Sequence, residues 1–176
     1  MNLLTSLVFS LLFVFTIPVF AGSIPSTGTT DVYFSPNGGG TTAIVSEIQA
    51  ARKVILVQAY SFTSTPIAKA LLDAHRRGVK IEAILDKSQK TAKYSSATFL
   101  FNAGVPVLID TRHAIAHNKI MIIDRSVLIT GSFNFTKAAE EKNAENLLIM
   151  KGNPKLIERY LSNFEDHKGH SEVYTR

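Results

Sequence analysis

The chain has 176 residues, enough for one domain that buries a hydrophobic core without disulfides or metals. Hydrophobic residues make up 45% of it, which excludes an intrinsically disordered chain, and the absence of cysteine excludes disulfides, thiolate metal sites and an acylated cysteine. The formal net charge of +5 suits a polyanionic partner such as nucleic acid, although mildly basic domains without such a partner are common.

The N-terminal segment is apolar from residue 3 to residue 20, and it is interrupted by Pro18 just before the small pair Ala21-Gly22. This pattern predicts a cleaved secretory signal peptide and therefore an exported protein, periplasmic or secreted. No lysine or arginine precedes the apolar run, so an uncleaved membrane anchor remains the alternative. The predicted division is a signal peptide at 1–21, a Ser/Thr/Gly-rich linker at 22–30, one domain at 31–168 and a loose polar tail at 169–176.

The first half of the domain alternates between strand patterns and helix patterns. Such alternation is typical of an α/β domain with helices packed on a largely parallel sheet. The expected strands cover 31–34, 53–60, 79–85 and 106–109, and the expected helices cover 44–51, 65–77 and 95–103.

A glycine-rich turn at residues 36–40 separates the first strand from the first helix. Such a turn can bind phosphate at a helix N-terminus. The lysine-serine pair of a Walker loop and the glycine spacing of a dinucleotide site are both absent. We therefore interpret this segment as a plain turn.

The second half begins with two apolar strands, 119–123 and 127–130, separated only by Asp124-Arg125-Ser126. This spacing predicts a β-hairpin. A short helix at 136–142, a strand at 145–150 and an amphipathic helix from Asn153-Pro154 to residue 168 follow. The predicted fold class is α/β: a layered sandwich with a mixed, largely parallel sheet flanked by helices.

Polar residues concentrate around the hairpin. His117 and Lys119 are two residues apart, so on a strand their side chains lie on the same side and reach one ligand. Ser132 and Asn134 repeat this spacing if the backbone stays extended, and Gly131 before them allows close backbone approach. Together these groups suit an oxyanion with several oxygens, whereas the alternative for the second pair is an ordinary turn.

Two other chemistries fit poorly. His113 and His117 have the i, i+4 spacing of a zinc-binding helix, but the residues from His117 onward have a strand pattern. We therefore expect His113 to be exposed or to support the site, and we predict no metal and no cofactor. Ser132 lacks the Gly-x-Ser-x-Gly turn of an acyl-transfer nucleophile, so it is interpreted as a hydrogen-bond donor.

The full spacing is His117-x-Lys119-x4-Asp124-x6-Gly131-Ser132-x-Asn134. It resembles the HKD signature of the phospholipase D superfamily, and the chain is most similar to the small, single-motif bacterial endonuclease and phosphodiesterase members. The resemblance implies a phospholipase D-like fold over the whole mature chain.

The resemblance also implies roles for the site residues. His117 would attack phosphorus and form a phosphohistidine, while the carboxylate of Glu145 holds the other ring nitrogen. Lys119, Ser132 and Asn134 would stabilise the pentacoordinate state without a metal.

Two further residues of this region need separate treatment. Glu145 is preferred over Glu140 and Glu141 because it opens an apolar strand, whereas those two lie in a helix expected to be solvated. Asp124 and Gly131 are expected to be structural, with Asp124 bonding backbone N–H groups near its turn.

The motif occurs once, whereas the reaction also needs a general acid for the leaving oxygen, and the resemblance implies that a second motif histidine supplies it. This predicts a twofold homodimer with two copies of His117 in one composite site. The favoured function is an exported, metal-independent, non-specific endonuclease acting on DNA, with RNA as an alternative substrate. The rivals are phospholipid hydrolysis, for which residues 99–101 are the one suggestive aromatic patch and are expected in the core, and a non-catalytic nucleic-acid-binding domain.

Overall fold

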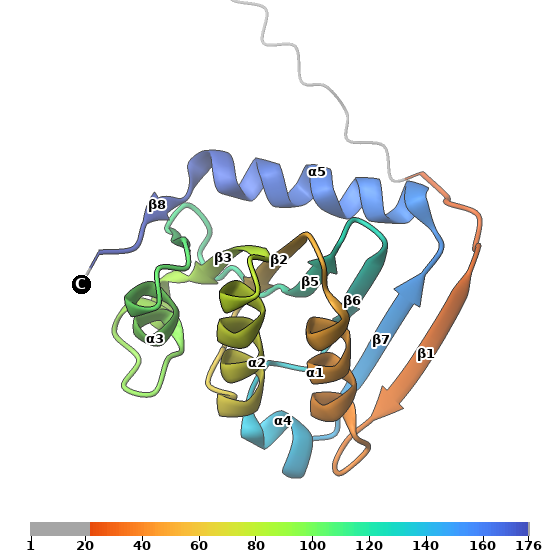
Figure 1. Ribbon diagram of the computed structural model, residues 1–176, viewed down its shortest axis with the longest axis horizontal. Helices are drawn as coiled ribbons and strands as arrows, with labels where there is room; N and C mark the ends of the chain where they lie inside the picture. The colour runs from red at the N-terminus through yellow and green to blue at the C-terminus, as the bar shows by residue number, and fades with distance from the viewer. Residues whose placement is uncertain (1–21, 176) are drawn as a thin grey trace, which may run out of the picture.

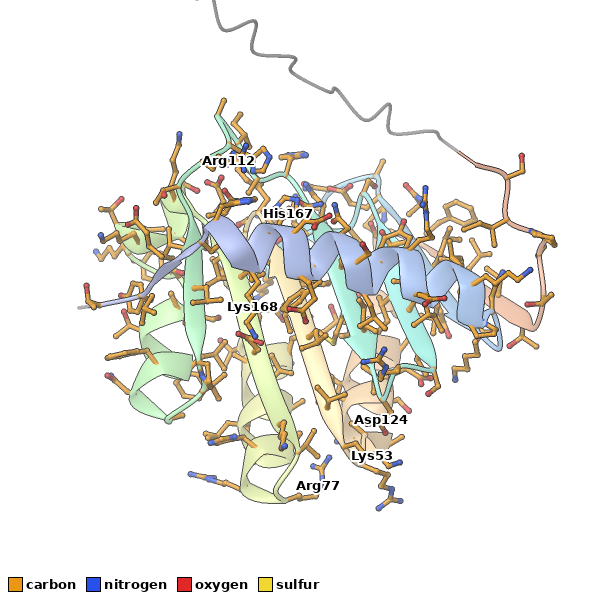
Figure 2. The ribbon with its side chains drawn as sticks, turned by 90° about the horizontal axis from the view of Figure 1, so that it is seen from above. Lys53, Arg77, Arg112, Asp124, His167 and Lys168 are labelled. Atoms are coloured by element: carbon orange, nitrogen blue, oxygen red, sulfur yellow. The ribbon has the colours of Figure 1, made fainter. Side chains whose placement is uncertain are left out.

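The computed structural model describes residues 22–175, so the expected signal peptide at 1–21 lies outside the described residues. One sheet forms the middle of three layers, with helices α1 and α2 on one face and α5 on the other (Figures 1 and 2). The strand order in the sheet is β1-β7-β6-β5-β2-β3-β4-β8. Within residues 22–175, no helix is both long enough and apolar enough to cross a membrane.

The strands, with their bounds, are β1 (Thr29–Phe34), β2 (Val54–Ala59), β3 (Lys80–Asp86), β4 (Val107–Asp110), β5 (Lys119–Ile123), β6 (Val127–Gly131), β7 (Asn146–Lys151) and β8 (Glu172–Val173). The helices are α1 (Gly40–Ala50), α2 (Thr65–Arg76), the 3₁₀ turn η1 (Lys87–Lys90), α3 (Ala97–Asn102), α4 (Lys137–Glu141) and α5 (Pro154–His170).

The α/β class and the mixed sheet are confirmed, but the expected predominance of parallel pairing is wrong. Only β2–β3 and β3–β4 are parallel, and every other neighbouring pair in the described sheet is antiparallel. The reason is that β5 and β6 form a hairpin, and the chain then returns through α4 at the same end of the sheet, which places β7 antiparallel beside β6. β1 then joins the far edge against β7 instead of lying beside β2.

The C-terminal residues belong to the domain, in contrast to the loose tail expected from residue 169. Helix α5 continues to His170, and β8 then pairs with β4 at the edge of the sheet. Tyr174 is only 4% exposed, and its hydroxyl lies 2.7 Å from the hydroxyl of Thr98. At the other end, β1 begins at Thr29, inside the segment expected to be a linker.

Both faces of the sheet are covered, which explains the uninterrupted apolar sequence of β5. Met121 and Ile123 pack toward α1 and α2, whereas Ile120 and Ile122 pack toward α5. A salt bridge of 2.8 Å between Lys168 and Glu82 fastens the end of α5 to β3; Lys168 is labelled in Figure 2.

The glycine-rich turn before α1 already holds an anion from the same chain. The Glu140 carboxylate accepts hydrogen bonds from the N–H groups of Gly39 (2.9 Å) and Thr41 (2.6 Å). The donors that could bind a phosphate are therefore occupied, which supports the interpretation of this segment as a structural turn. The expectation that Glu140 is solvated is wrong.

Candidate active site

Most residues of the HKD spacing meet at one end of the sheet. We call this place the motif site, and its residues are His117, Lys119, Gly131, Ser132 and Asn134. Lys119 opens β5 opposite Ala59 at the end of β2, and Gly131 closes β6 opposite Leu147 near the start of β7. Ser132 and Asn134 follow directly after Gly131. The antiparallel hairpin therefore returns the second half of the motif to the strand end that carries the first half.

His117 and Lys119 contact each other, as the strand alternation predicts. The Lys119 Nζ donates to the carbonyl oxygen of His117 at 2.7 Å and lies 2.8 Å from the ring Nδ1 of the same histidine. The lysine is only 6% exposed, whereas His117 is exposed. A buried cation thus supports an imidazole that faces solvent.

Burial lowers the pKa of Lys119, and the negative charge of Glu145 opposes this shift. A charged Lys119 donates to Nδ1, which places the ring proton of a neutral His117 on Nε2. That tautomer cannot attack through Nε2. An attack through Nε2 therefore requires Lys119 to turn away toward an anion, or to be neutral and accept a hydrogen bond from Nδ1–H.

Tyr60 packs against both residues of this pair, and no pattern in the sequence predicts that contact. Its ring centroid lies 4.5 Å from that of His117, and the Lys119 Nζ lies 5.1 Å from its centre. The aromatic face therefore holds the imidazole on one side and stabilises the cation. Tyr60 follows the end of β2, and it reaches the site because β2 pairs with β5. The order of strands in the sheet does not follow from their order along the chain, so the sequence alone does not reveal this contact.

Ser132 is fixed by the start of β7. Its Oγ accepts a hydrogen bond from the N–H of Asn146 at 3.0 Å, and its N–H donates to the carbonyl of Asn146, also at 3.0 Å. The hydroxyl proton remains free to donate to a ligand. Gly131 before it has a φ of 145°, and a Cβ there would collide with the Asn146 carbonyl oxygen, so the expected close backbone approach is present.

Asn134 lies on the same side of the chain as Ser132. Phe133 and Phe135 are buried in the core, which leaves the intervening side chains on the opposite side. The Asn134 Oδ1 is buried and has no hydrogen-bond partner in the described chain. An unpaired buried acceptor is costly, whereas the Nδ2 amide group of the same side chain is a donor suited to an anionic oxygen.

Glu145 does not orient His117 within the described protomer, in contrast to the expectation. Its carboxylate accepts a hydrogen bond from the Asn143 amide at 3.1 Å. The geometric reason is the strand order, because β6 lies between β5 and β7. The backbones of β5 and β7 are therefore about 10 Å apart, and the Glu145 carboxylate is directed to Asn143 instead of across β6 to His117.

Asp124 lies at the opposite end of β5 from the motif site, beside Lys53 (Figure 2). Its carboxylate accepts from the N–H groups of Arg52 (2.8 Å), Lys53 (2.7 Å) and Val54 (2.9 Å). Burial raises the pKa of this carboxyl, but the three hydrogen bonds outweigh burial and hold it below its usual range. Asp124 is therefore a structural residue. Its carboxylate stabilises the start of β2, whereas the sequence predicted bonds to its own turn.

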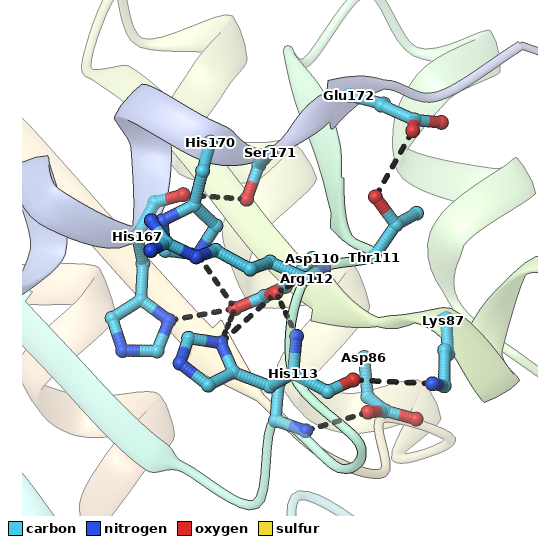
Figure 3. Close-up of polar contacts among 11 residues, drawn as sticks. Asp86, Lys87, Asp110, Thr111, Arg112, His113, His167, His170, Ser171 and Glu172 are labelled. Atoms are coloured by element: carbon cyan, nitrogen blue, oxygen red, sulfur yellow. Dashed lines mark hydrogen bonds and ion pairs between the residues drawn. The ribbon is translucent and has the colours of Figure 1, made fainter.

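His113 has no part in a pair with His117. Its ring instead contacts the buried carboxylate of Asp110, which His167 and His170 also contact (Figure 3). We call these four residues the histidine cluster. Burial raises the pKa of Asp110, but the hydrogen bonds from the three histidines hold it well below its usual range, so the carboxylate is anionic.

Residues 44–168 match the family model described as "Cardiolipin synthase, PLD-like domain". The match covers most of the chain and the whole motif. The chain belongs to the phospholipase D superfamily. The superfamily includes phosphodiester hydrolases, and this chain is one of them.

Two named relatives of the superfamily match more than two thirds of this chain. The chain is 42% identical over 141 residues to "Phospholipase D" of Rickettsia typhi, a match covering 80% of this chain and 69% of the relative. It is 33% identical over 122 residues to "Mitochondrial cardiolipin hydrolase" of Mus musculus, covering 69% of this chain and 55% of that protein. The chain therefore spans only about half the length of the mouse relative.

Two solved structures share the fold of this superfamily member. Nuc from Salmonella typhimurium, a phospholipase D family member, is 37% identical with a TM-score of 0.80, and the match covers 85% of this chain and 100% of Nuc. NucT from Helicobacter pylori is 24% identical with a TM-score of 0.78, covering 84% of this chain and 100% of NucT, which shows the shared fold.

Proposed function

We propose that this phosphodiester hydrolase is an exported, non-specific endonuclease that cleaves DNA without a catalytic metal. The observation that carries the proposal is the exposed His117 held against the buried Lys119 at an open end of the sheet. A solvent-facing nucleophile suits a long polymer, and the net charge of +5 favours binding to its phosphates.

In the proposed reaction, Nε2 of His117 attacks phosphorus and one phosphodiester P–O bond breaks. The Lys119 ammonium, the Ser132 hydroxyl and the Asn134 amide stabilise the charge on the phosphoryl oxygens. A general acid protonates the leaving oxygen. Water then attacks the phosphohistidine and releases the new phosphate end of the strand. Arrival of the anionic phosphate draws Lys119 away from Nδ1, which frees that nitrogen to carry the proton.

A twofold homodimer supplies the two groups that one protomer lacks. His117 of the partner subunit would be the acid for the leaving oxygen. Since Glu145 lies two strands from His117 in its own protomer, we propose that Glu145 of the partner subunit holds Nδ1.

Phe34 marks the surface where the second copy would pack. It is 69% exposed, and it directly precedes Ser35, whose hydroxyl accepts from the Glu145 N–H at 3.1 Å. We expect Phe34→Ser to shift the protein from dimer to monomer in sedimentation equilibrium and to lower activity with the dimer fraction. Phe99→Ser removes an exposed phenyl group from α3 and should leave the dimer intact. A fully active wild-type monomer would exclude the composite site.

Phospholipid hydrolysis is the second candidate function. The expectation that residues 99–101 lie in the core holds only for Leu100, because Phe99 and Phe101 are 44% and 38% exposed. Tyr94 is exposed near them, so an aromatic surface for lipid contact exists. The names of the Rickettsia and mouse relatives favour the same substrate class.

One assay separates these functions. The purified protein is incubated with plasmid DNA and, separately, with phosphatidylcholine vesicles, each in excess EDTA and with His117→Asn in parallel. The proposal predicts DNA cleavage that persists in EDTA and disappears in the variant. Choline release without DNA cleavage would establish the lipid reaction, and DNA that is shifted but uncut would indicate a binding domain.

A further inference from the structure

The histidine cluster lies at the same end of the sheet as the motif site but three strands away from β5. Asp110 ends β4, and His113 lies in the loop that leads to β5. His167 and His170 occupy the last turn of α5, one helical step of three residues apart. The cluster therefore joins the C-terminal helix to the loop that carries His117 (Figure 3).

Three imidazoles converge on one carboxylate oxygen. The Asp110 Oδ2 lies 2.9 Å from the Nδ1 of His113, 2.7 Å from the Nδ1 of His167 and 3.3 Å from the Nε2 of His170. One ligand atom from each of the four residues lies within 4.8 Å of the others. Four ligands around an ion at about 2.0 Å stand about 3.3 Å apart in a tetrahedron, so small side-chain rotations suffice.

The surroundings also resemble those of a built metal site. The Asp110 side chain is 0% exposed, those of His167 and His170 are 12% and 17% exposed, and that of His113, at the outer side of the cluster, is 44% exposed. The second oxygen of the carboxylate, Oδ1, accepts from the backbone N–H groups of Arg112 (3.1 Å) and His113 (3.2 Å), which fixes the direction of Oδ2. Such support from outside the coordination sphere orients metal ligands in known sites.

We propose that the histidine cluster binds one Zn²⁺ ion in a closed, four-coordinate structural site. Three imidazoles and one carboxylate are borderline ligands of the type that zinc prefers, and four protein ligands leave no open position for a catalytic water. The ion would tie the end of α5 to the loop before His117. This inference does not depend on the substrate of the motif site.

The test uses the whole protein, stripped of metal and titrated with Co²⁺ as a spectroscopic substitute for zinc. We expect saturation at one equivalent with the intense visible absorption of four-coordinate cobalt. His167→Gln and His170→Gln should each weaken binding by at least about tenfold. His75→Gln, which alters a histidine on α2 outside the cluster, and His117→Asn, in the motif site, should bind as the wild type does.

A thermal measurement with Zn²⁺ supplies the second readout. At about 100 times the dissociation constant, Zn²⁺ should raise the melting temperature of the wild type by roughly 5–10 °C, and EDTA should reverse the shift. The shift should be absent in His167→Gln. Wild-type protein that binds no cobalt, or binds it only with the weak spectrum of six-coordination, overturns the proposal whether or not the variants fold. Binding that survives in both histidine variants also overturns it.

Discussion

The motif site and the histidine cluster are built in opposite ways from similar residues. The motif site takes its four main groups from 18 consecutive positions, His117 to Asn134, because one hairpin carries them. The histidine cluster joins residues 57 positions apart, Asp110 and His167, and forms only when α5 packs beside β4. A spacing in the sequence therefore reveals the first site, whereas only the folded chain reveals the second.

The largest expected effect tests whether the hairpin contributes chemistry and not merely structure. Lys119→Met removes the buried cation but keeps an unbranched side chain, so the turnover number should fall by about 10²–10³-fold. The melting temperature should not fall, because the variant no longer buries a charge. Steady-state DNA cleavage and thermal unfolding measure the two effects.

Lys155→Met, an exposed position at the start of α5, is the matched control and should retain activity. A Lys119→Met protein that cleaves DNA at the wild-type rate would show that the hairpin motif is structural.

Asp124 belongs to the motif by its spacing, but its carboxylate stabilises the fold by accepting backbone hydrogen bonds at the start of β2. Asp124→Asn should lower the free energy of unfolding by about 1–3 kcal/mol at pH 7 while activity stays within a few-fold. Since its pKa is lowered in the folded state, this contribution is present above the unfolded value of about 3.9 and is lost as the pH falls through the folded value.

Urea unfolding between pH 7 and pH 3 checks this sign, since the difference in unfolding free energy between wild type and Asp124→Asn should narrow toward the acid end. Asp73→Asn, which removes a surface ion pair with Arg76, should cost less than about 1 kcal/mol. A gap that widens toward acid would contradict the assignment.

The smallest effect concerns Tyr60, which lies outside the motif but packs against it. Tyr60→Leu removes the aromatic face from His117 and Lys119, and we expect a fall in turnover of about tenfold or less. Tyr60→Phe keeps the face and should restore most of the rate. Equal losses in both variants would mean that the hydroxyl group, and not the ring, supports the site.

The sequence predicted features that depend on neighbouring residues. The hairpin, the contact between His117 and Lys119 and the close approach at Gly131 all follow from local periodicity and turn chemistry. The features that depend on strand order were missed or wrong.

Strand order explains each of these errors. β1 pairs with β7 and not within a parallel sheet, and Glu145 is separated from His117 by an intervening strand. The polar residues after 168 gave no apolar pattern, although β8 pairs with β4 through its backbone. Long-range pairing is set by the packing of the whole chain, which no short window of sequence contains.

The most direct test of the motif site is to trap the covalent intermediate. A ³²P-labelled DNA substrate is mixed with the enzyme in EDTA, quenched in alkaline detergent within the first turnover and digested for mass spectrometry. The account predicts an alkali-stable, acid-labile phosphoryl adduct on His117 that is absent from His117→Asn. Undiminished cleavage by His117→Asn, with no adduct on the wild-type histidine, would contradict it.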